Sequence, residues 1–247
     1  MFSITGLGQV FTENTLYAKF RRLIVIFFFK LIFSSKSSNL IVQNSYDFDL
    51  IFKRNLIDKK RLHLIKSSGV NLKEFPYIKE IKETVPVVTL ASRLLWEKGI
   101  KQFVEAARLL KQKNLNIRFI LVGDTQDSNP RSVPRSVIES WVNEGLVDWL
   151  GRKENMSDIF AKSNIVCLPT VYGEGVPKVI LESAATGRVL VVSDNPGCKE
   201  LVIDRVTGLV VKDGNPNQLA SSINELINDD TLREYLASNA MKKIFKE

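Results

Sequence analysis

The chain has 247 residues, of which 45% are hydrophobic and 25% charged, a balance typical of a soluble globular protein with one or two domains. Its formal net charge of +8 is unevenly distributed, because residues 1–84 contain 14 basic and 7 acidic residues, whereas residues 85–247 contain 21 and 20. Two cysteines and one histidine form neither a disulfide framework nor a metal-ligand pattern. This usage is typical of a reducing cytosol and excludes a disulfide-stabilised secreted domain.

The longest apolar run, Leu23–Phe33, has two interpretations. It contains Lys30 and is shorter than the roughly 20 residues that span a bilayer, and it lacks a signal-peptide cleavage site, so we expect neither a transmembrane anchor nor secretion. One interpretation is a helix packed in a domain core. In the other, Arg21, Arg22 and Lys30 hold phospholipid headgroups while Phe27–Phe29 dip below them. The basic first third favours such an anionic surface, with nucleic acid as the rival polyanion.

The N-terminal third predicts four elements and a linker. We expect a helix over residues 15–33, a strand in "NLIVQN" (39–44), a helix over 46–55 and a strand in "RLHLIK" (61–66). The charged stretch 73–86 contains two prolines, and it is expected to pack poorly and to link two domains.

A regular alternation begins at Val85. "VPVVTLAS" is a run of the kind buried on both faces of a parallel sheet, and residues 100–112 follow with helical spacing of their apolar positions. Five further strand and helix pairs follow it. Six such units predict an α/β fold with a doubly wound, Rossmann-like parallel sheet, since a closed barrel needs eight. The expected domains are therefore 1–84 with the linker, which is either a small lobe or the last part of a larger one, and 85–247.

Ligands of open parallel sheets bind at the carboxyl ends of strands, where two loops carry paired charges. Arg93 follows one strand and Lys98 precedes the next helix, so the two cations suit a diphosphate. Glu174 and Glu182 lie around a Gly-Val-Pro turn, about 12 Å apart if the rise is helical throughout. This separation is roughly the distance from the sugar of a nucleotide-sugar to its ribose. The alternatives are ordinary solvated charges and a simple Lys178–Glu182 pair.

A third loop, Asn195–Gly197, turns directly into a helix. Its amides, Gly197 among them, either touch phosphate or only turn the chain. Cys198 has no histidine nearby in the sequence and is not expected to be a nucleophile. His63, inside a predicted strand, is expected to have a structural role.

Several segments resemble, in order and spacing, the nucleotide-sugar half of a retaining GT-B glycosyltransferase of group 1, or family four. The resemblance covers nearly all of residues 85–247, and it is carried by "SRLLWEKGI", "ILVGD", "LPTVYGEGVPKVILESAATG", "SDNPGCKELVIDRVTGLVV" and "NPNQLASSINELINDDTLREYLASNA". Upstream, "ITGLGQVFT", "IVQNSYDFDLIF" and "LIKSSGVNLKEF" resemble more loosely the end of the N-terminal lobe in members that extend lipid-linked polysaccharides of bacterial envelopes, including capsule and lipopolysaccharide.

The resemblance implies a role for each matching residue. Arg93 and Lys98 would hold the donor diphosphate and act mainly in an oxocarbenium-like transition state. Glu174 would lie near the donor sugar, Glu182 on the ribose, and Arg152 beside the base.

The resemblance also implies partners. Gly175 and Val176 would offer backbone amides at the sugar phosphate, and neither a metal nor another cofactor is expected, since the nucleotide-diphospho-sugar is a substrate.

The expected partners are that donor, a lipid-linked sugar acceptor, the inner face of the cytoplasmic membrane and a chain supplying the rest of the N-terminal lobe, with no nucleic acid. Three readings stay open: an active transferase, a non-catalytic nucleotide-sugar-binding remnant, and a basic docking module for membrane or nucleic acid.

Overall fold

The protein consists of two compact units. The computed structural model describes residues 1–7, 11, 15–35, 37–81, 85–126, 128–171, 175–212 and 214–245. The first unit is made of Met1–Gly69 with Tyr172–Lys178 and Asn195–Glu200, and the second of Val70–Val171, Val179–Asp194 and Leu201–Glu247.

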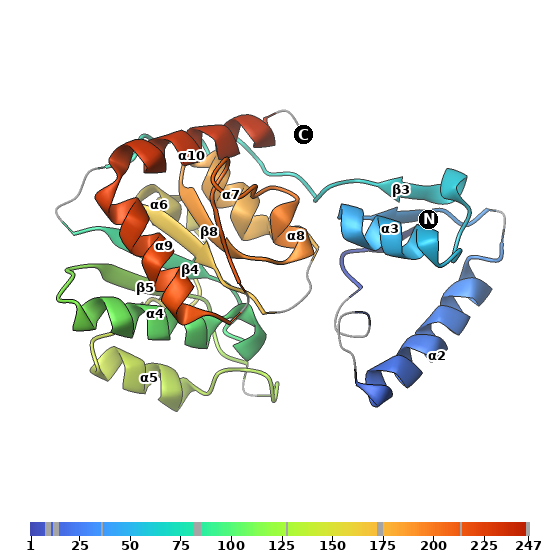
Figure 1. Ribbon diagram of the computed structural model, residues 1–247, viewed down its shortest axis with the longest axis horizontal. Helices are drawn as coiled ribbons and strands as arrows, with labels where there is room; N and C mark the ends of the chain where they lie inside the picture. Colours follow the sequence, from blue (N-terminus) through green and yellow to red (C-terminus); the bar gives the residue numbers. More distant parts are fainter. Residues whose placement is uncertain are drawn as a thin grey trace. The chain divides into compact units, whose positions relative to one another are not determined.

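The first unit is a small parallel sheet with helices (Figure 1). Its strands are β1 (Phe2–Ile4), β2 (Leu40–Val42) and β3 (Leu62–Leu64), hydrogen-bonded in that order, and its helices are α2 (Leu16–Ile32), α3 (Ser45–Lys53) and the short 3-10 turn η1 (Lys59–Arg61). Its core is formed by Phe33, Leu40, Val42, Ile51, Leu56, Ile57 and Leu62. The two strands and two helices expected here are confirmed, whereas β1 was not expected.

Helix α2 begins at an N-cap and packs with one side only. The Thr15 hydroxyl accepts a hydrogen bond from the Ala18 N–H at 3.1 Å, which satisfies one of the free amides of the first turn. Ala18 is the one buried residue of the helix, and Ile26 and Phe29 pack against the core. The interpretation of this run as a core helix therefore holds for one side only, where Ile26, Phe29 and Phe33 meet the core. Phe29 also points inward, and not outward beside Phe27 as the membrane interpretation expected.

The second unit is a six-stranded parallel sheet with helices on both faces (Figure 1). Its strands are β4 (Val87–Ala91), β5 (Arg118–Val122), β6 (Asp148–Trp149), β7 (Ile165–Leu168), β8 (Val189–Ser193) and β9 (Leu209–Val211). Its order, β6-β5-β4-β7-β8-β9, reverses direction beside β4. Its helices, in chain order, are η2 (Trp96–Lys98), α4 (Ile100–Gln112), α5 (Arg135–Asn143), α6 (Met156–Ala161), α7 (Lys178–Ala185), α8 (Pro196–Lys199), α9 (Pro216–Asn228) and α10 (Asp230–Ile244). The first residue of α7 and all of α8 belong to the segments that are grouped with the first unit. The expected doubly wound α/β fold is confirmed.

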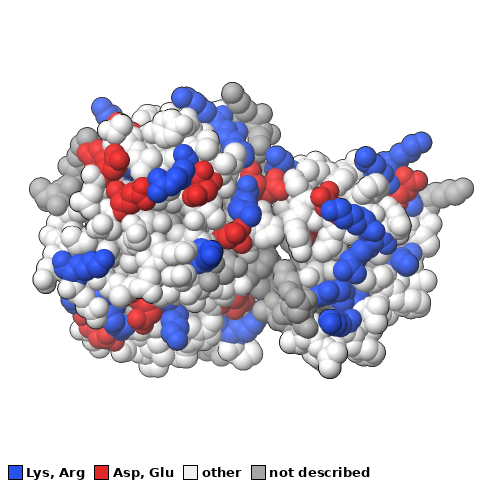
Figure 2. Space-filling model, viewed as in Figure 1, with Lys and Arg blue, Asp and Glu red and all other residues white. Residues whose placement is uncertain are grey.

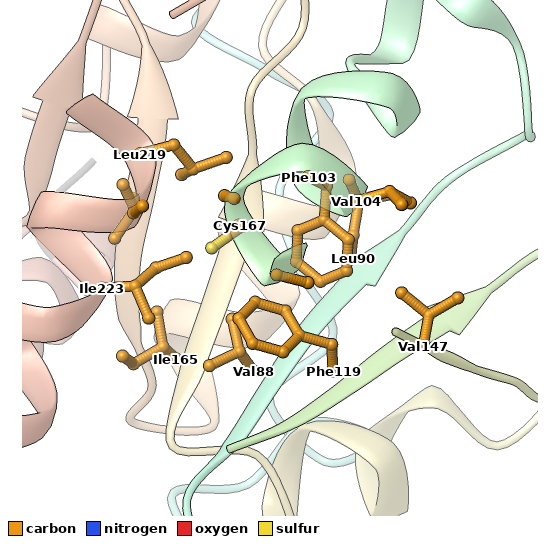
Figure 3. Packing of buried hydrophobic residues seen from close by; sticks show 14 of the residues in the cluster. Val88, Leu90, Phe103, Val104, Phe119, Val147, Ile165, Cys167, Leu219 and Ile223 are labelled. Atoms are coloured by element: carbon orange, nitrogen blue, oxygen red, sulfur yellow. The ribbon is translucent and has the colours of Figure 1, made fainter. Parts of the chain in front are cut away.

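Burial on both faces explains the unbroken apolar strands. Every residue of β4 and β8 is buried. Val88 and Leu90 belong to the cluster shown in Figure 3, where Phe103 of α4 and Ile223 of α9 meet the sheet. The intervening side chains, such as Thr89, face the other layer. Because successive strand residues alternate between faces, a sheet covered twice requires apolar residues at nearly every position.

The segment that leads into the second unit is tightly attached to it. Phe75 is buried, and the Ile78 N–H donates to a carbonyl of the loop after α7 at 3.2 Å. The Glu80 carboxylate accepts two hydrogen bonds from Nε of Arg233 on α10, at 2.8 and 3.1 Å. The expectation that residues 73–86 pack poorly is therefore wrong at Phe75, Ile78 and Glu80, and we call the segment 73–81 that contains them the strap.

Candidate functional site

A cavity of about 520 Å³ lies at the carboxyl edge of the six-stranded sheet, within the second unit. It is lined by Ala91, Ser92, Arg93, Val122, Gly123, Asp124, Thr125, Gln126, Arg152, Lys153, Met156, Phe160, Val179 and Glu182. These residues come from the ends of β4 and β5, the loop after β6, and helices α6 and α7. The cavity thus opens beside the reversal in strand order, the usual place for a ligand in such sheets, and its volume suits a small organic molecule.

Three loops at the floor of the cavity are held together through Gly123. Its φ is +138°, and a Cβ on it would lie 1.8 Å from the Ser92 carbonyl oxygen, so no other residue fits without moving the backbone. The Gly123 N–H donates to the Gly151 carbonyl at 2.9 Å, and the Trp149 indole N–H donates to the Gly123 carbonyl at 2.9 Å. The loops after β4, β5 and β6 are therefore fixed relative to one another.

Positive charge predominates in the lining. The cavity has three basic side chains, Arg93, Arg152 and Lys153, and two acidic ones, Asp124 and Glu182. All three basic side chains are exposed, and none makes a hydrogen bond or an ion pair with any residue in the described part of the chain. A guanidinium offers a planar fork of donors that matches phosphate oxygens. Unpaired cations around a concave surface thus favour an anionic ligand.

The structure brings three of the predicted residues into this one cavity. Glu182 lies in the second turn of α7 and is half-buried, and it shares the cavity with Arg93 and Arg152. The carboxylate that was expected to accompany it, Glu174, lies outside the described residues.

Lys98 does not line the cavity, although the turn that contains it is firmly held. Lys98 ends η2 and is half-buried. The Glu97 carbonyl accepts a hydrogen bond from the Thr170 hydroxyl at 2.9 Å, which ties the turn to the loop after β7. Gly99 follows with a φ of +77°, and a Cβ there would lie 2.0 Å from the Pro169 carbonyl oxygen.

The remaining predicted residues belong to the first unit. A Cβ on Gly175 would lie 1.7 Å from the Thr5 carbonyl oxygen, so this glycine is required by a close backbone approach. Val176 is buried. The Gly197 N–H donates to the Asn195 side-chain oxygen at 3.2 Å, which is a helix cap, and this favours the structural alternative for that turn.

The nucleophilic side chains have structural surroundings. Cys167 and Cys198 are buried, and burial raises the pKa of the Cys167 thiol, which keeps it protonated. His63 lies on β3, and its ring Nε2 is 3.1 Å from the side-chain oxygen of Asn39, which directly precedes β2. The position of His63 agrees with the structural role expected for it.

Sequence reasoning missed two charged residues of the cavity, Asp124 and Lys153. Asp124, in "ILVGD", comes two residues after β5 ends, and Lys153, in "WLGRK", comes four residues after β6 ends. The rule that ligands bind at carboxyl ends would have found them, had it been applied to every strand and not only to paired charges.

Known proteins resemble the chain along most of its length. A family model described as glycosyl transferases group 1 matches residues 72–243. The Campylobacter jejuni enzyme N,N'-diacetylbacillosaminyl-diphospho-undecaprenol alpha-1,3-N-acetylgalactosaminyltransferase is 33% identical over 250 aligned residues, which cover 96% of this chain and 63% of the enzyme. The chain therefore spans less than two thirds of this relative's length.

Solved structures of glycosyltransferases share the fold. Sucrose-phosphate synthase from Thermosynechococcus elongatus superposes with a TM-score of 0.80 at 23% identity, over 99% of this chain and 62% of that one. HepE from Anabaena, solved in complex with UDP, gives a TM-score of 0.73 at 22% identity, over 85% and 59%. The fold is therefore GT-B-like, and because the family match covers well over half of its residues, the chain belongs to the group 1 glycosyltransferases.

Proposed function

We propose that the chain is the donor-binding part of a glycosyltransferase that moves a sugar from a nucleoside-diphosphate sugar to a lipid-linked acceptor, with retention at the anomeric carbon. The observation that supports this most directly is the cavity at the carboxyl edge. It combines the volume of a nucleotide-sized ligand, three cations without described partners, and the half-buried Glu182. A diphosphate flanked by a ribose and a base needs this combination.

Each end of the donor is assigned to different side chains. In the proposal, Arg93 and Lys98 neutralise the diphosphate, and Glu182 accepts hydrogen bonds from the ribose hydroxyls. Arg152 lies beside the base. Glu174 lies near the donor sugar.

Backbone amides complete the proposed donor site. Those of Gly175 and Val176 are assigned to the sugar phosphate.

The chemistry follows from this placement. The bond between the anomeric carbon and the phosphate oxygen breaks, and its electron pair leaves with the diphosphate. The acceptor hydroxyl attacks from the same face of the oxocarbenium-like sugar and gives its proton to the leaving phosphate oxygen, so the configuration is retained. Negative charge grows on the diphosphate as this bond breaks, and Arg93 and Lys98 stabilise that charge in the transition state.

The acceptor class follows from the Campylobacter jejuni relative. Its name describes transfer to a sugar linked through a diphosphate to undecaprenol. A sugar on a polyprenyl diphosphate is therefore the proposed acceptor, in the synthesis of an envelope polysaccharide, and the proposed place of reaction is the inner face of the cytoplasmic membrane.

Isothermal titration calorimetry with UDP, GDP and dTDP tests the site. We expect one of the three to bind, and Arg93→Ala and Glu182→Gln each to weaken binding by roughly 10- to 150-fold, the equivalent of about 1.5 to 3 kcal/mol for a charge-assisted hydrogen bond. Lys113→Ala, an exposed cation that follows the last residue of α4, is the control and should bind as wild type does. Equal affinity in all variants, or no binding of any nucleotide, would contradict the proposal.

A transfer assay separates binding from catalysis. The chain is incubated with the nucleotide sugar whose base binds and with a polyprenyl-diphosphate-linked sugar, and lipid extracts are analysed by mass spectrometry. A mass increase of one sugar supports transfer. Donor binding without turnover would leave the chain with a binding role only.

A further inference from the structure

Helix α2 presents a large apolar surface to solvent. The structure describes all 17 of its residues, and nine large apolar side chains are 41–85% exposed: Leu16, Tyr17, Phe20, Leu23, Ile24, Phe27, Phe28, Leu31 and Ile32. Single exposed apolar residues are ordinary on protein surfaces, but a contiguous patch of this kind marks a surface that meets another apolar phase.

The patch points away from the sheet on which the helix lies. Ala18 and Phe29 form the inward side of α2. At about 100° per residue, Phe20, Phe27 and Leu31 project from the opposite side. In a layered α/β lobe, another helix on the same sheet would cover a flank of α2 and leave this outer side free. Phe20, Phe27 and Leu31 on this outer side are 55–62% exposed.

The charges of α2 lie along the edges of the patch. The helix contains four basic residues and no acidic one. At about 100° per residue, Lys19 and Lys30 fall on one flank of the apolar surface and Arg21 on the other. Long basic side chains at such edges extend toward phosphate while their stems stay in an apolar phase. Figure 2 shows Lys and Arg side chains gathered on one face of this unit.

The length of α2 determines how it would meet a bilayer. Its 17 residues span about 25 Å, less than the hydrocarbon core requires. Among the described residues, no helix is long and apolar enough to cross a membrane. A helix with one apolar face and basic edges lies in the plane of the interface.

We propose that α2 docks the chain on an anionic phospholipid bilayer, with Phe20, Phe27 and Leu31 at the acyl boundary and Lys19, Lys30 and Arg21 among the headgroups. Nucleic acid fits this surface poorly, because the centre of the exposed side is aliphatic and aromatic and the cations lie only at its edges. This proposal is independent of the donor site, since no residue of α2 lines the cavity.

Vesicle co-sedimentation of the full chain tests the docking surface. We expect binding to vesicles of phosphatidylglycerol and phosphatidylethanolamine, and at least tenfold weaker binding for the double variant Phe20→Ser/Phe27→Ser, since two apolar side chains no longer enter the interface. Lys19→Gln and Lys30→Gln should each weaken binding about fivefold and reduce the preference over phosphatidylcholine vesicles. Tyr235→Ser, which removes a 54% exposed aromatic from α10, is the matched control and should bind as wild type does.

Three results would overturn the proposal. One is equal vesicle binding by the double variant and by Tyr235→Ser. Another is a dimer in analytical ultracentrifugation that the double variant dissociates, together with no vesicle binding, because a second copy would then cover α2. The third is binding to a nucleic acid duplex that equals binding to anionic vesicles. Circular dichroism establishes that each variant is folded, and its nucleotide affinity should match wild type, which separates failure here from failure of the donor site.

Discussion

The ion pair between the strap and α10 offers a sharp test of how the second unit is assembled. The side chains of Arg233 and Glu80 are only 7% and 14% exposed. The Arg233 guanidinium gives Nε to both Glu80 oxygens and one terminal nitrogen to Asp230 at 2.7 Å. Glu80→Ala would leave this guanidinium buried with a single carboxylate that is itself 47% exposed.

The size of the effect follows from that burial. Breaking a buried pair costs about 3 to 5 kcal/mol, and because Asp230 remains, we expect the lower end, about 3 kcal/mol. For a protein of this size, 1 kcal/mol lowers the melting temperature by roughly 2–4 °C, so the expected decrease is about 6–12 °C. The surface pair of Arg118 and Asp148, with side chains 53% and 49% exposed, is the contrast. Asp148→Ala should cost no more than about 1 kcal/mol.

Tryptophan fluorescence reports on this unit selectively, because Trp96, Trp141 and Trp149 all lie in it. Urea and thermal unfolding of wild type, Glu80→Ala and Asp148→Ala, followed by this fluorescence, give the three values. If Glu80→Ala destabilises the protein no more than Asp148→Ala does, the strap is not held by its buried ion pair and the reasoning is refuted.

Three further predictions concern single side chains. Gly99→Ala should lower the unfolding free energy, measured in urea, by about 1–3 kcal/mol or more. The reason is that its Cβ would meet the Pro169 carbonyl oxygen and that the φ of this residue lies in the left-handed region. An unchanged unfolding free energy would contradict this close approach. Thr170→Val should lower the unfolding free energy by about 1 kcal/mol, because the hydrogen bond to the Glu97 carbonyl is lost, and Thr170→Ser should retain this bond. An unchanged unfolding free energy in Thr170→Val would show that the bond does not contribute to stability. Burial raises the pKa of Asp47 above its ordinary value of 3.8, so its contribution to stability declines as pH rises from about 3.8 through the folded pKa. The Asp47→Asn variant should lack this decline, so its unfolding free energy, measured in urea, should increase relative to that of wild type between pH 4 and 7. If the unfolding free energies of variant and wild type change in parallel with pH, Asp47 does not titrate differently on folding.

The fold of the second unit could be predicted because its signals are local. Strands covered on both faces require apolar residues at every position, and β4 shows this within five residues. Strand β1 could not be predicted, since three residues at a sheet edge show no period. The strap was read wrongly because its charges suggested solvent. Glu80 is buried by a partner 153 residues away, which no local pattern reveals.

The candidate site could be predicted in part for the same reason. Arg93 and Arg152 follow strand ends and Glu182 lies in the second turn of α7, and the parallel topology gathers such positions at one edge. The position of Lys98 depends on how its turn packs against the loop after β7. That packing is set by contacts between segments far apart in the sequence.

The boundary between the two units has a practical consequence for dissecting the protein. The second unit starts at Val70, and the two residues just before it with positive φ, Ser67 at +67° and Gly69 at +74°, mark the turn where the chain changes direction. A recombinant fragment that starts at Val85, where the sheet pattern begins, would discard Phe75 and Glu80 and expose the surface they cover. A fragment that starts at Val70 retains that cover and is the better choice for crystallisation or nuclear magnetic resonance of the second unit.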